Sequence, residues 1–126
     1  MKRLVFNSTP LIYLAKVGLS KIFENLKSEK VTCSEVKREV VDEGKRKGVP
    51  DAFVLEKLSS KVLQVVEPTD KEFLSRLLRT RGLHVTDAEV LALARELDGL
   101  AVVDDEVARK TEGLLYSLCG YALCFG

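Results

Sequence analysis

Short apolar runs alternate along this chain with longer segments in which apolar residues recur every three or four positions. A short apolar run predicts a buried strand, and the three-to-four spacing predicts an amphipathic helix. The predicted strands span residues 3–6, 31–33, 62–66 and 100–103. The predicted helices span residues 10–16, 19–26, 34–44, 51–59, 70–81, 87–97 and about 105–113. Strands separated by helices are typical of βαβ units, so we expect an α/β fold with a mainly parallel sheet.

The tail at residues 114–126 fits neither pattern cleanly. It carries strand-favouring residues and a glycine, Gly120, at which the chain can turn, but no polar cap closes it. Two interpretations are open: the tail is a last strand of the sheet, or it is an apolar surface that a second subunit covers. The chain shows no linker, internal repeat or low-complexity stretch, so we expect a single domain over residues 1–126.

Composition adds few constraints. A content of 46% hydrophobic and 31% charged residues is ordinary for a globular domain. Because the net charge is only +1, any affinity for nucleic acid must come from a local basic patch. The three cysteines lack the spacing of a zinc site and predict reduced thiols in a cytoplasmic protein. Neither a signal peptide nor a membrane-spanning segment is expected.

Polar side chains follow two of the predicted strands directly. Asn7 comes after the first strand, and Asp104 and Asp105 come after the strand at 100–103. In open α/β sheets, ligands bind beyond the carboxyl ends of the strands, which is where these residues fall. Successive residues leaving a strand point in opposite directions, so Asp104 and Asp105 are not expected to serve one site equally, and the sequence leaves open which does. The alternatives are an Asx-turn at Asn7 and simple helix capping by an aspartate.

Two acidic residues lie on the apolar stripes of predicted helices. Asp87 shares a helix face with Val90 and Leu91, three and four residues further on. Glu39 falls between Val36 and Val40 in the same kind of pattern. An aspartate in a first helical turn also complements the helix dipole, and a glutamate at this position is also compatible with a solvated rim.

The start of the first predicted helix is marked by Thr9 and Pro10, as an N-cap followed by proline at the first helical position.

Together the two strand ends, Asn7 and either Asp104 or Asp105, and the two inward helical acids, Asp87 and Glu39, predict one shared cleft. Burying several carboxylates together is costly unless a cation neutralises them. Mg²⁺ or Mn²⁺ is the simplest such cation, since both take hard oxygen ligands. The leading hypothesis from the residues is therefore a metal-dependent phosphodiesterase. A basic stretch, Lys45-Arg46-Lys47, is a candidate for contacts with phosphates, although cations near a helix C-terminus are also generic stabilisers.

Four stretches resemble, in order, the motifs of the PIN (PilT N-terminus) domain family, the VapC-like ribonuclease superfamily. Residues 4–19 look like the family's opening and are closest to the branch that reads Asn-Thr-Ser-Pro-Leu-Ile. Residues 34–40 fit the second motif, residues 86–94 resemble the third and residues 102–109 resemble the last. The resemblance covers residues 3 to about 113, and its strength comes from the four matches together.

This resemblance implies a Rossmann-like three-layer α/β/α sandwich and Mg²⁺- or Mn²⁺-dependent endoribonuclease activity. It implies metal ligation by Asn7, Asp87, Asp104 and Asp105, with Glu39, Asp87 and Asp104 as the catalytic set. Lys45, Arg46 and Lys47 are then the candidate RNA contacts. Many prokaryotic members are toxins held inactive by an antitoxin protein, and dimers are common, so an antitoxin and a homodimer are further expectations. The same motifs recur in RNA-processing nucleases.

Two departures from the family pattern keep other functions open. Most members have Asp where this chain has Asn7, and many continue past the last acidic motif with further helices. The alternative is a PIN-like module, weak or inactive in catalysis, that binds RNA or protein. A receiver-like regulatory domain is disfavoured, because the strand at 62–66 is followed by Glu67 and Pro68 where that class needs a phosphorylatable aspartate.

Overall fold

The computed structural model describes residues 2–18, 20–80, 82–110 and 122–125. In this part of the chain one five-stranded sheet has the order β3-β2-β1-β4-β5, and every neighbouring pair is parallel. Its strands are β1 (Leu4–Phe6), β2 (Lys30–Thr32), β3 (Leu63–Val65), β4 (Leu100–Asp104) and β5 (Ala122–Phe125). The prediction of an α/β fold with a mainly parallel sheet is confirmed.

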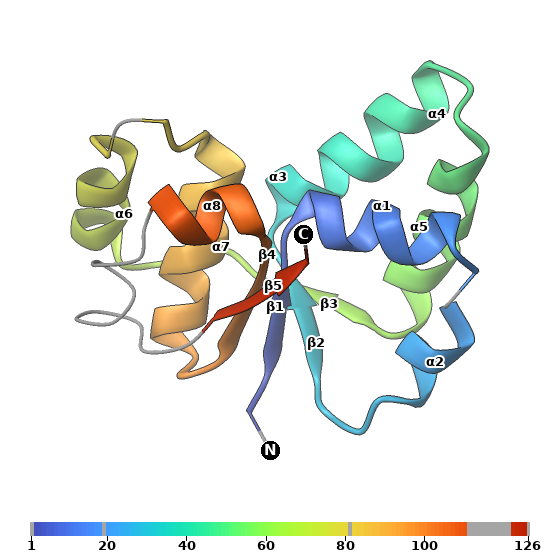
Figure 1. Cartoon of the computed structure of the whole chain (residues 1–126), viewed down its shortest axis with the longest axis horizontal. Coiled ribbons are helices and arrows are strands. Elements are labelled where there is room, and N and C mark those ends of the chain that lie inside the picture. Colours follow the sequence, from blue (N-terminus) through green and yellow to red (C-terminus); the bar gives the residue numbers. More distant parts are fainter. Residues whose placement is uncertain (1, 19, 81, 111–121, 126) are drawn as a thin grey trace.

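Helices cover both faces of the sheet (Figure 1). On one side lie α1 (Ser8–Lys16), α2 (Ser20–Asn25), a continuous helix made of α3 (Ser34–Lys37), η1 (Arg38–Glu43) and α4 (Gly44–Arg46), and α5 (Pro50–Lys61). On the other side lie α6 (Lys71–Leu78), α7 (Val85–Glu96) and α8 (Asp105–Lys110). This is the three-layer α/β/α sandwich that the family resemblance implies. None of the helices in the described ranges combines the length and hydropathy needed to cross a membrane.

The predicted elements are all present among the described residues, but the start of α1 differs. The helix begins at Ser8, and its N-cap is Asn7, whose side chain accepts a hydrogen bond from the Ser8 backbone N–H. The prediction that Thr9 is the cap and Pro10 the first helical residue is therefore wrong by two positions. Proline is still tolerated within this first turn, because its missing N–H would have no partner inside the helix.

The tail is a strand at its end. Residues Ala122–Phe125 form β5, which pairs in parallel with β4 in the register Ala101↔Ala122 to Asp104↔Phe125. Of the two interpretations of the tail, the last-strand interpretation is confirmed for these residues. The rest of the tail, residues 114–121 and Gly126, lies outside the described part of the chain.

Helix α7 anchors the core. Ala88 and residues 90–94 are each at most 1% exposed, and the helix packs on β1, β4 and α6. The alanines in this run allow the helix axis to approach the sheet closely, while its leucines fill the space on either side. Full burial of one large aliphatic side chain contributes about 1.5–3 kcal/mol. The first turn of α7, which carries Asp87, is thereby fixed at the edge of the sheet.

The carboxyl ends of β1 and β4 meet at that edge. Phe6 pairs with Val102, and the backbone N–H of Asn7 donates to the Val102 carbonyl oxygen at 3.0 Å. The chain leaves β1 at Asn7 and leaves β4 at Asp104, so these two residues lie at one edge, as the sequence predicted.

Candidate functional site

A cavity of about 610 Å³ opens at the carboxyl edge of β1 and β4. Its walls come from the start of α1, from α3 and η1, from the start of α7, and from the end of β4 with α8. The structure brings four of the residues singled out from the sequence to its lining, namely Asn7, Glu39, Asp87 and Asp104. The backbone of Asp105 begins α8, but its side chain lies outside what the structure describes.

Asn7 and Asp87 form the buried floor of the cavity. They are 4% and 8% exposed, and Asn7 Nδ2 donates to Asp87 Oδ1 at 2.8 Å. The orientation of the amide is fixed from its other side, because Asn7 Oδ1 accepts from the Ser8 N–H at 2.8 Å and an amide nitrogen cannot. Asn7 therefore presents a donor to the carboxylate, and this hydrogen bond gives the buried Asp87 Oδ1 a partner.

Asp87 is held from a second direction. Its Oδ2 accepts from the backbone N–H of His84 at 3.0 Å, the residue that caps α7. Val90 and Leu91 are fully buried on the same helix face, as the spacing predicted. The sequence offered a helix-dipole role in the first turn as the alternative to a role in the site, and the structure has Asp87 both in the first turn of α7 and in the cavity lining.

Asp104 likewise both caps a helix and lines the cavity. It is half-buried at the end of β4, and its Oδ1 accepts from the Val107 N–H at 2.8 Å, so it caps α8 while it lines the cavity. Capping fixes the carboxylate without neutralising it, since a backbone N–H carries only a partial charge. The second oxygen of Asp104 makes no hydrogen bond within the described residues.

Glu39 corrects one expectation. The sequence placed it on the inward stripe with Val36 and Val40, but Glu39 is exposed at the rim while Val40 and Val41 are both buried. The reason is the π-helical segment η1, which begins one residue before Glu39. Its wider turn holds an extra residue, so two successive valines face the core and Glu39 is turned toward the cavity mouth.

The basic stretch predicted to contact RNA lies on α4 and just beyond it, outside the cavity lining. Lys45 pairs with Glu56 at 2.7 Å and lies 5.5 Å from the centre of the Phe53 ring. Arg46 pairs with Glu43. The role of Lys45, Arg46 and Lys47 in RNA binding stays a prediction.

Sequence reasoning missed three residues of the lining. They are Arg38, His84 and Lys110, none of which lies in a pattern that points to a site. Arg38 pairs with Glu35 and Glu43, and Lys110 pairs with Glu106 at 2.8 Å. The spacing of Glu106 and Lys110, four residues apart on a helix, was the available signal for the second pair.

These pairs also shift the titration of their members. The Glu35 carboxylate raises the pKa of Arg38, and Lys110 lowers the pKa of Glu106. The Arg38 guanidinium and the Glu106 carboxylate are therefore both held in their charged forms.

The donor set fits a hard divalent cation that keeps most of its water. Within the described residues no three His, Cys, Asp or Glu side chains lie close enough to enclose a metal ion. Asp87 and Asp104 nonetheless provide two carboxylates, and Ser8 Oγ, beside them in the lining, is buried without a hydrogen-bond partner in the described part of the chain. Mg²⁺ is commonly bound through one or two carboxylates with several waters, so this set is compatible with Mg²⁺ or Mn²⁺. Zinc fits this set less well, because it prefers nitrogen and sulfur ligands and His84 is the one imidazole or thiol side chain in the described lining.

A buried thiol lies near the cavity wall. Cys33 is 0% exposed, and burial raises the pKa of its thiol to about 12. It faces the Glu89 carboxylate, whose own pKa is raised, first by burial. Because the thiolate is the nucleophile, Cys33 is expected to be inert in the folded protein.

This inertness is testable by alkylation with iodoacetamide at pH 8, followed by peptide mapping. The pKa of the Cys33 thiol lies three units above its usual 9.0, so its thiolate is about 1000-fold scarcer than in the unfolded chain. We expect Cys33 to be modified at least about 100-fold more slowly in buffer than in about 6 M urea, in which the protein is unfolded. Equal rates in the two conditions would contradict the buried, protonated thiol.

Comparisons with known proteins agree with this fold. A family model described as a PIN domain matches residues 3–115. The crystal structure of PAE2754 from Pyrobaculum aerophilum superimposes with a TM-score of 0.57, covering 93% of this chain and 96% of that one at 21% identity. That likeness concerns the fold alone. No curated protein matches the sequence. Because the family model spans most of the chain, the protein belongs to the PIN-domain family, whose members are generally nucleases.

Proposed function

We propose that this chain is a divalent-metal-dependent endoribonuclease that hydrolyses RNA phosphodiester bonds. The observation that carries the proposal is the convergence of Asp87, from a helix, and Asp104, from a strand, on one cavity at the carboxyl edge of the sheet. Membership of a family of nucleases supports the same conclusion. Two carboxylates and an unpaired buried hydroxyl are what a hydrated Mg²⁺ or Mn²⁺ would bind, and a bound ion of this kind lowers the pKa of water and neutralises phosphate charge.

The residues of the chain have separate tasks in this proposal. Asp87 and Asp104 would hold the cation, which would supply charge neutralisation at the scissile phosphate. Asn7 fixes the Asp87 carboxylate through the 2.8 Å hydrogen bond and so keeps one of its oxygens in a constant position. Glu39, exposed at the rim, is in a position to orient the attacking water and accept its proton.

The expected protein partners follow only from the family resemblance, and the expected cytoplasmic location follows from the cysteines. A toxin of a toxin–antitoxin pair, acting as a cytoplasmic homodimer, stays a prediction, as does the role of Asp105 as a further ligand.

A second function is favoured by one observation. The amide of Asn7 and the His84 backbone N–H already give both Asp87 oxygens a hydrogen bond, so this carboxylate has hydrogen-bond partners without a cation. A PIN-like module that binds RNA or protein without cutting would have this property. Metal binding and cleavage therefore have to be measured together.

The test is calorimetric titration of Mn²⁺ into the metal-free protein, with cleavage of single-stranded RNA measured alongside. We expect saturable binding and Mn²⁺-dependent cleavage in the native chain, and loss of both in the Asp87→Asn/Asp104→Asn variant. Removing residues that only support a metal ligand costs about 10–100-fold, so loss of two ligands is expected to lower cleavage by at least about 100-fold.

The matched control is Asp98→Asn. Asp98 is an exposed acid distant from the cavity lining, and it has a positive φ of 50°, which asparagine tolerates. Its binding and cleavage should equal those of the native chain. Saturable Mn²⁺ binding without any cleavage would instead favour the binding module, and no binding at millimolar metal would overturn the metal-dependent mechanism.

A further inference from the structure

The cavity is strongly acidic, which is a difficulty for a polyanionic substrate. Its described lining holds five carboxylate side chains and only two permanent cations, Arg38 and Lys110. One metal ion compensates the charge at the floor, around Asp87 and Asp104, but not at the walls. A nucleic-acid strand that crosses this cavity therefore meets attraction at two points of the wall and repulsion elsewhere.

The two cations lie on opposite walls. Arg38 begins η1, on one side of the sheet, and Lys110 ends α8, on the other side (Figure 1). The buried floor with Asn7 and Asp87 is formed where β1 ends, between these layers. A strand that is anchored on both walls would consequently lay the phosphate between its anchors over the carboxylates.

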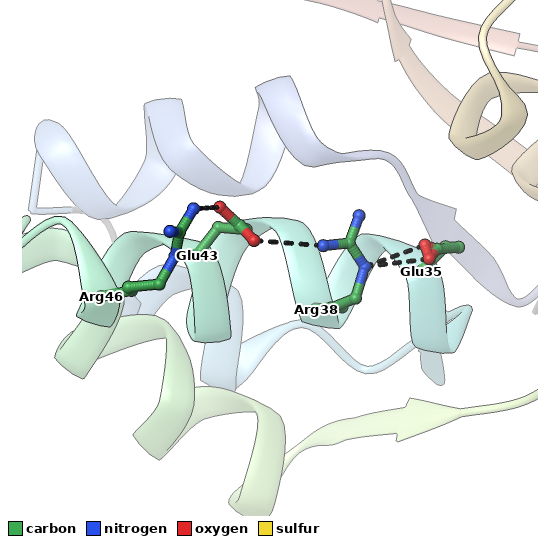
Figure 2. A network of polar contacts seen from close by, with 4 residues as sticks. All are labelled: Glu35, Arg38, Glu43 and Arg46. Atoms are coloured by element: carbon green, nitrogen blue, oxygen red, sulfur yellow. Dashed lines mark hydrogen bonds and ion pairs between the residues drawn. The ribbon is translucent and has the colours of Figure 1, made fainter.

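Arg38 is held in place by a network along one helix face (Figure 2). Its Nε lies 2.9 and 3.0 Å from the two oxygens of Glu35, and its Nη1 lies 3.3 Å from Glu43, which Arg46 neutralises from the other side. Nη2 is directed away from both carboxylates and makes no contact within the described residues. A guanidinium with one free edge in a fixed orientation is suited to a phosphate oxygen.

The π-helical segment η1 allows Arg38 and Glu43 to pair on one face of the helix. Arg38 and Glu43 are five residues apart, and on an α-helix such residues point in widely different directions. The wider turn of η1 brings them to one face, so that the helix carries a continuous row of alternating charges from Glu35 to Arg46.

Lys110 is oriented by two contacts. Its Nζ donates to Glu106 at 2.8 Å and to the Gly82 carbonyl oxygen at 3.1 Å. An ammonium group has three donors, so one remains for a phosphate oxygen. Its side chain is 35% exposed, and that of Arg38 is 52% exposed, so both can be reached from solvent.

We propose, on the basis of the endoribonuclease function above, that Arg38 and Lys110 bind the backbone phosphates of the RNA on the two sides of the scissile one. Asp87 is 8% exposed, at the floor between two walls. A flexible single strand can bend one phosphate down to that depth, whereas the regular backbone of a duplex cannot. The basic stretch at residues 45–47 is not needed for this contact.

The experiment measures the salt dependence of RNA binding in the Asp87→Asn/Asp104→Asn background, which does not cut the probe. The probe is a fluorescent oligouridylate followed by anisotropy at about 50–200 mM salt. Each phosphate contact contributes about 0.7 to the slope of log Kobs against log salt for a single strand. We expect Arg38→Ala and Lys110→Ala each to reduce the slope by about 0.7, Arg38→Lys to retain it, and an RNA duplex of equal length to compete at least tenfold less well.

The matched control is Arg3→Ala. Arg3 is also an exposed arginine paired with a glutamate, at 2.7 Å from Glu29, but it lies before β1, at the opposite end of the strands. The slope of log Kobs against log salt for Arg3→Ala should equal that of the Asp87→Asn/Asp104→Asn background. Circular dichroism checks that each variant is folded. Unchanged slopes for Arg38→Ala and Lys110→Ala, or a reduced slope in Arg46→Ala alone, would overturn this proposal. RNA cleavage by the native chain would in that case still support the nuclease function. Absence of both RNA binding and native cleavage would overturn the two together.

Discussion

Asn7→Asp is expected to destabilise the metal-free protein by about 1–3 kcal/mol and to tighten Mn²⁺ binding at least about tenfold. Asn7 Nδ2 donates to Asp87 Oδ1 at 2.8 Å between side chains that are 4% and 8% exposed. The substitution replaces this donor with a carboxylate oxygen, so two like charges face each other at hydrogen-bond distance. A divalent cation bound between them converts the same repulsion into attraction. The measurement is urea unfolding in EDTA and in Mn²⁺, with calorimetry for the affinity.

The pH dependence of this variant has a definite sign. Two adjacent carboxylates raise the pKa of the pair in the folded state, so the folded variant binds a proton more readily than its unfolded chain. Its stability is therefore retained at acid pH and lost as the pH rises through the raised pKa. In EDTA, the difference in unfolding free energy between the variant and the native chain should therefore shrink as the pH falls toward about 4, the pKa of a free carboxyl group.

The control for this prediction is Asn25→Asp, the same substitution at an exposed position at the end of α2. Its stability should change by less than about 0.5 kcal/mol in either condition. An Asn7→Asp protein as stable in EDTA as the native chain, or with weaker Mn²⁺ binding, would show that Asn7 and Asp87 do not share the site described here.

Leu91→Ala is expected to lower the free energy of unfolding by about 2–5 kcal/mol. Leu91 is 0% exposed in the middle of α7, where the helix packs on β1 and β4. Truncation removes buried apolar surface and leaves a cavity that a rigid helix–sheet contact cannot close. Since domains of this kind are stable by only about 5–15 kcal/mol, the loss is a large share of the total. Urea unfolding at about 25 °C measures this change in the free energy of unfolding.

Leu78→Ala provides the matched comparison. Leu78 is 43% exposed at the end of α6, so the same truncation removes far less buried surface there. We expect a loss of about 1 kcal/mol or less. Similar losses for the two variants would mean that α7 does not pack on the sheet as described.

Sequence predicted the part of the site that depends on local pattern. Asn7 and Asp104 were located because each ends an apolar strand, and parallel neighbouring strands end at one edge. Asp87 was located because Val90 and Leu91 recur at helical spacing, and the helix is regular there. In each case the position of the side chain is determined by residues within one turn or one strand.

Glu39 was misplaced because its helix is not regular. A stripe drawn with 3.6 residues per turn runs through Val36, Glu39 and Val40, whereas η1 buries Val40 and Val41 and turns Glu39 outward. Whether a helix widens at one turn depends on what it packs against, which in this chain includes α1 and α5. That information is absent from the local pattern.

Arg38 and Lys110 were missed for a related reason. Each looks like an ordinary solvated base beside an acid, and only the meeting of η1 and α8 at one cavity gives them a common neighbourhood. They are separated along the chain by most of its length, so only the tertiary arrangement brings them together.

The pairing of β1 with β4 also governs when activity can arise during folding. Leu4 lies beside Leu100, and the Asn7–Asp87 hydrogen bond joins residues 80 positions apart. Contacts of such long range form late, because a long loop must close before they contribute. Asp87 and Asp104 lie in the second half of the chain, whereas Asn7 and Glu39 lie in the first, so the cavity is complete only when both halves have folded together. Under the proposed function, a growing polypeptide would not cut the message that encodes it before the distant ends of the domain have joined.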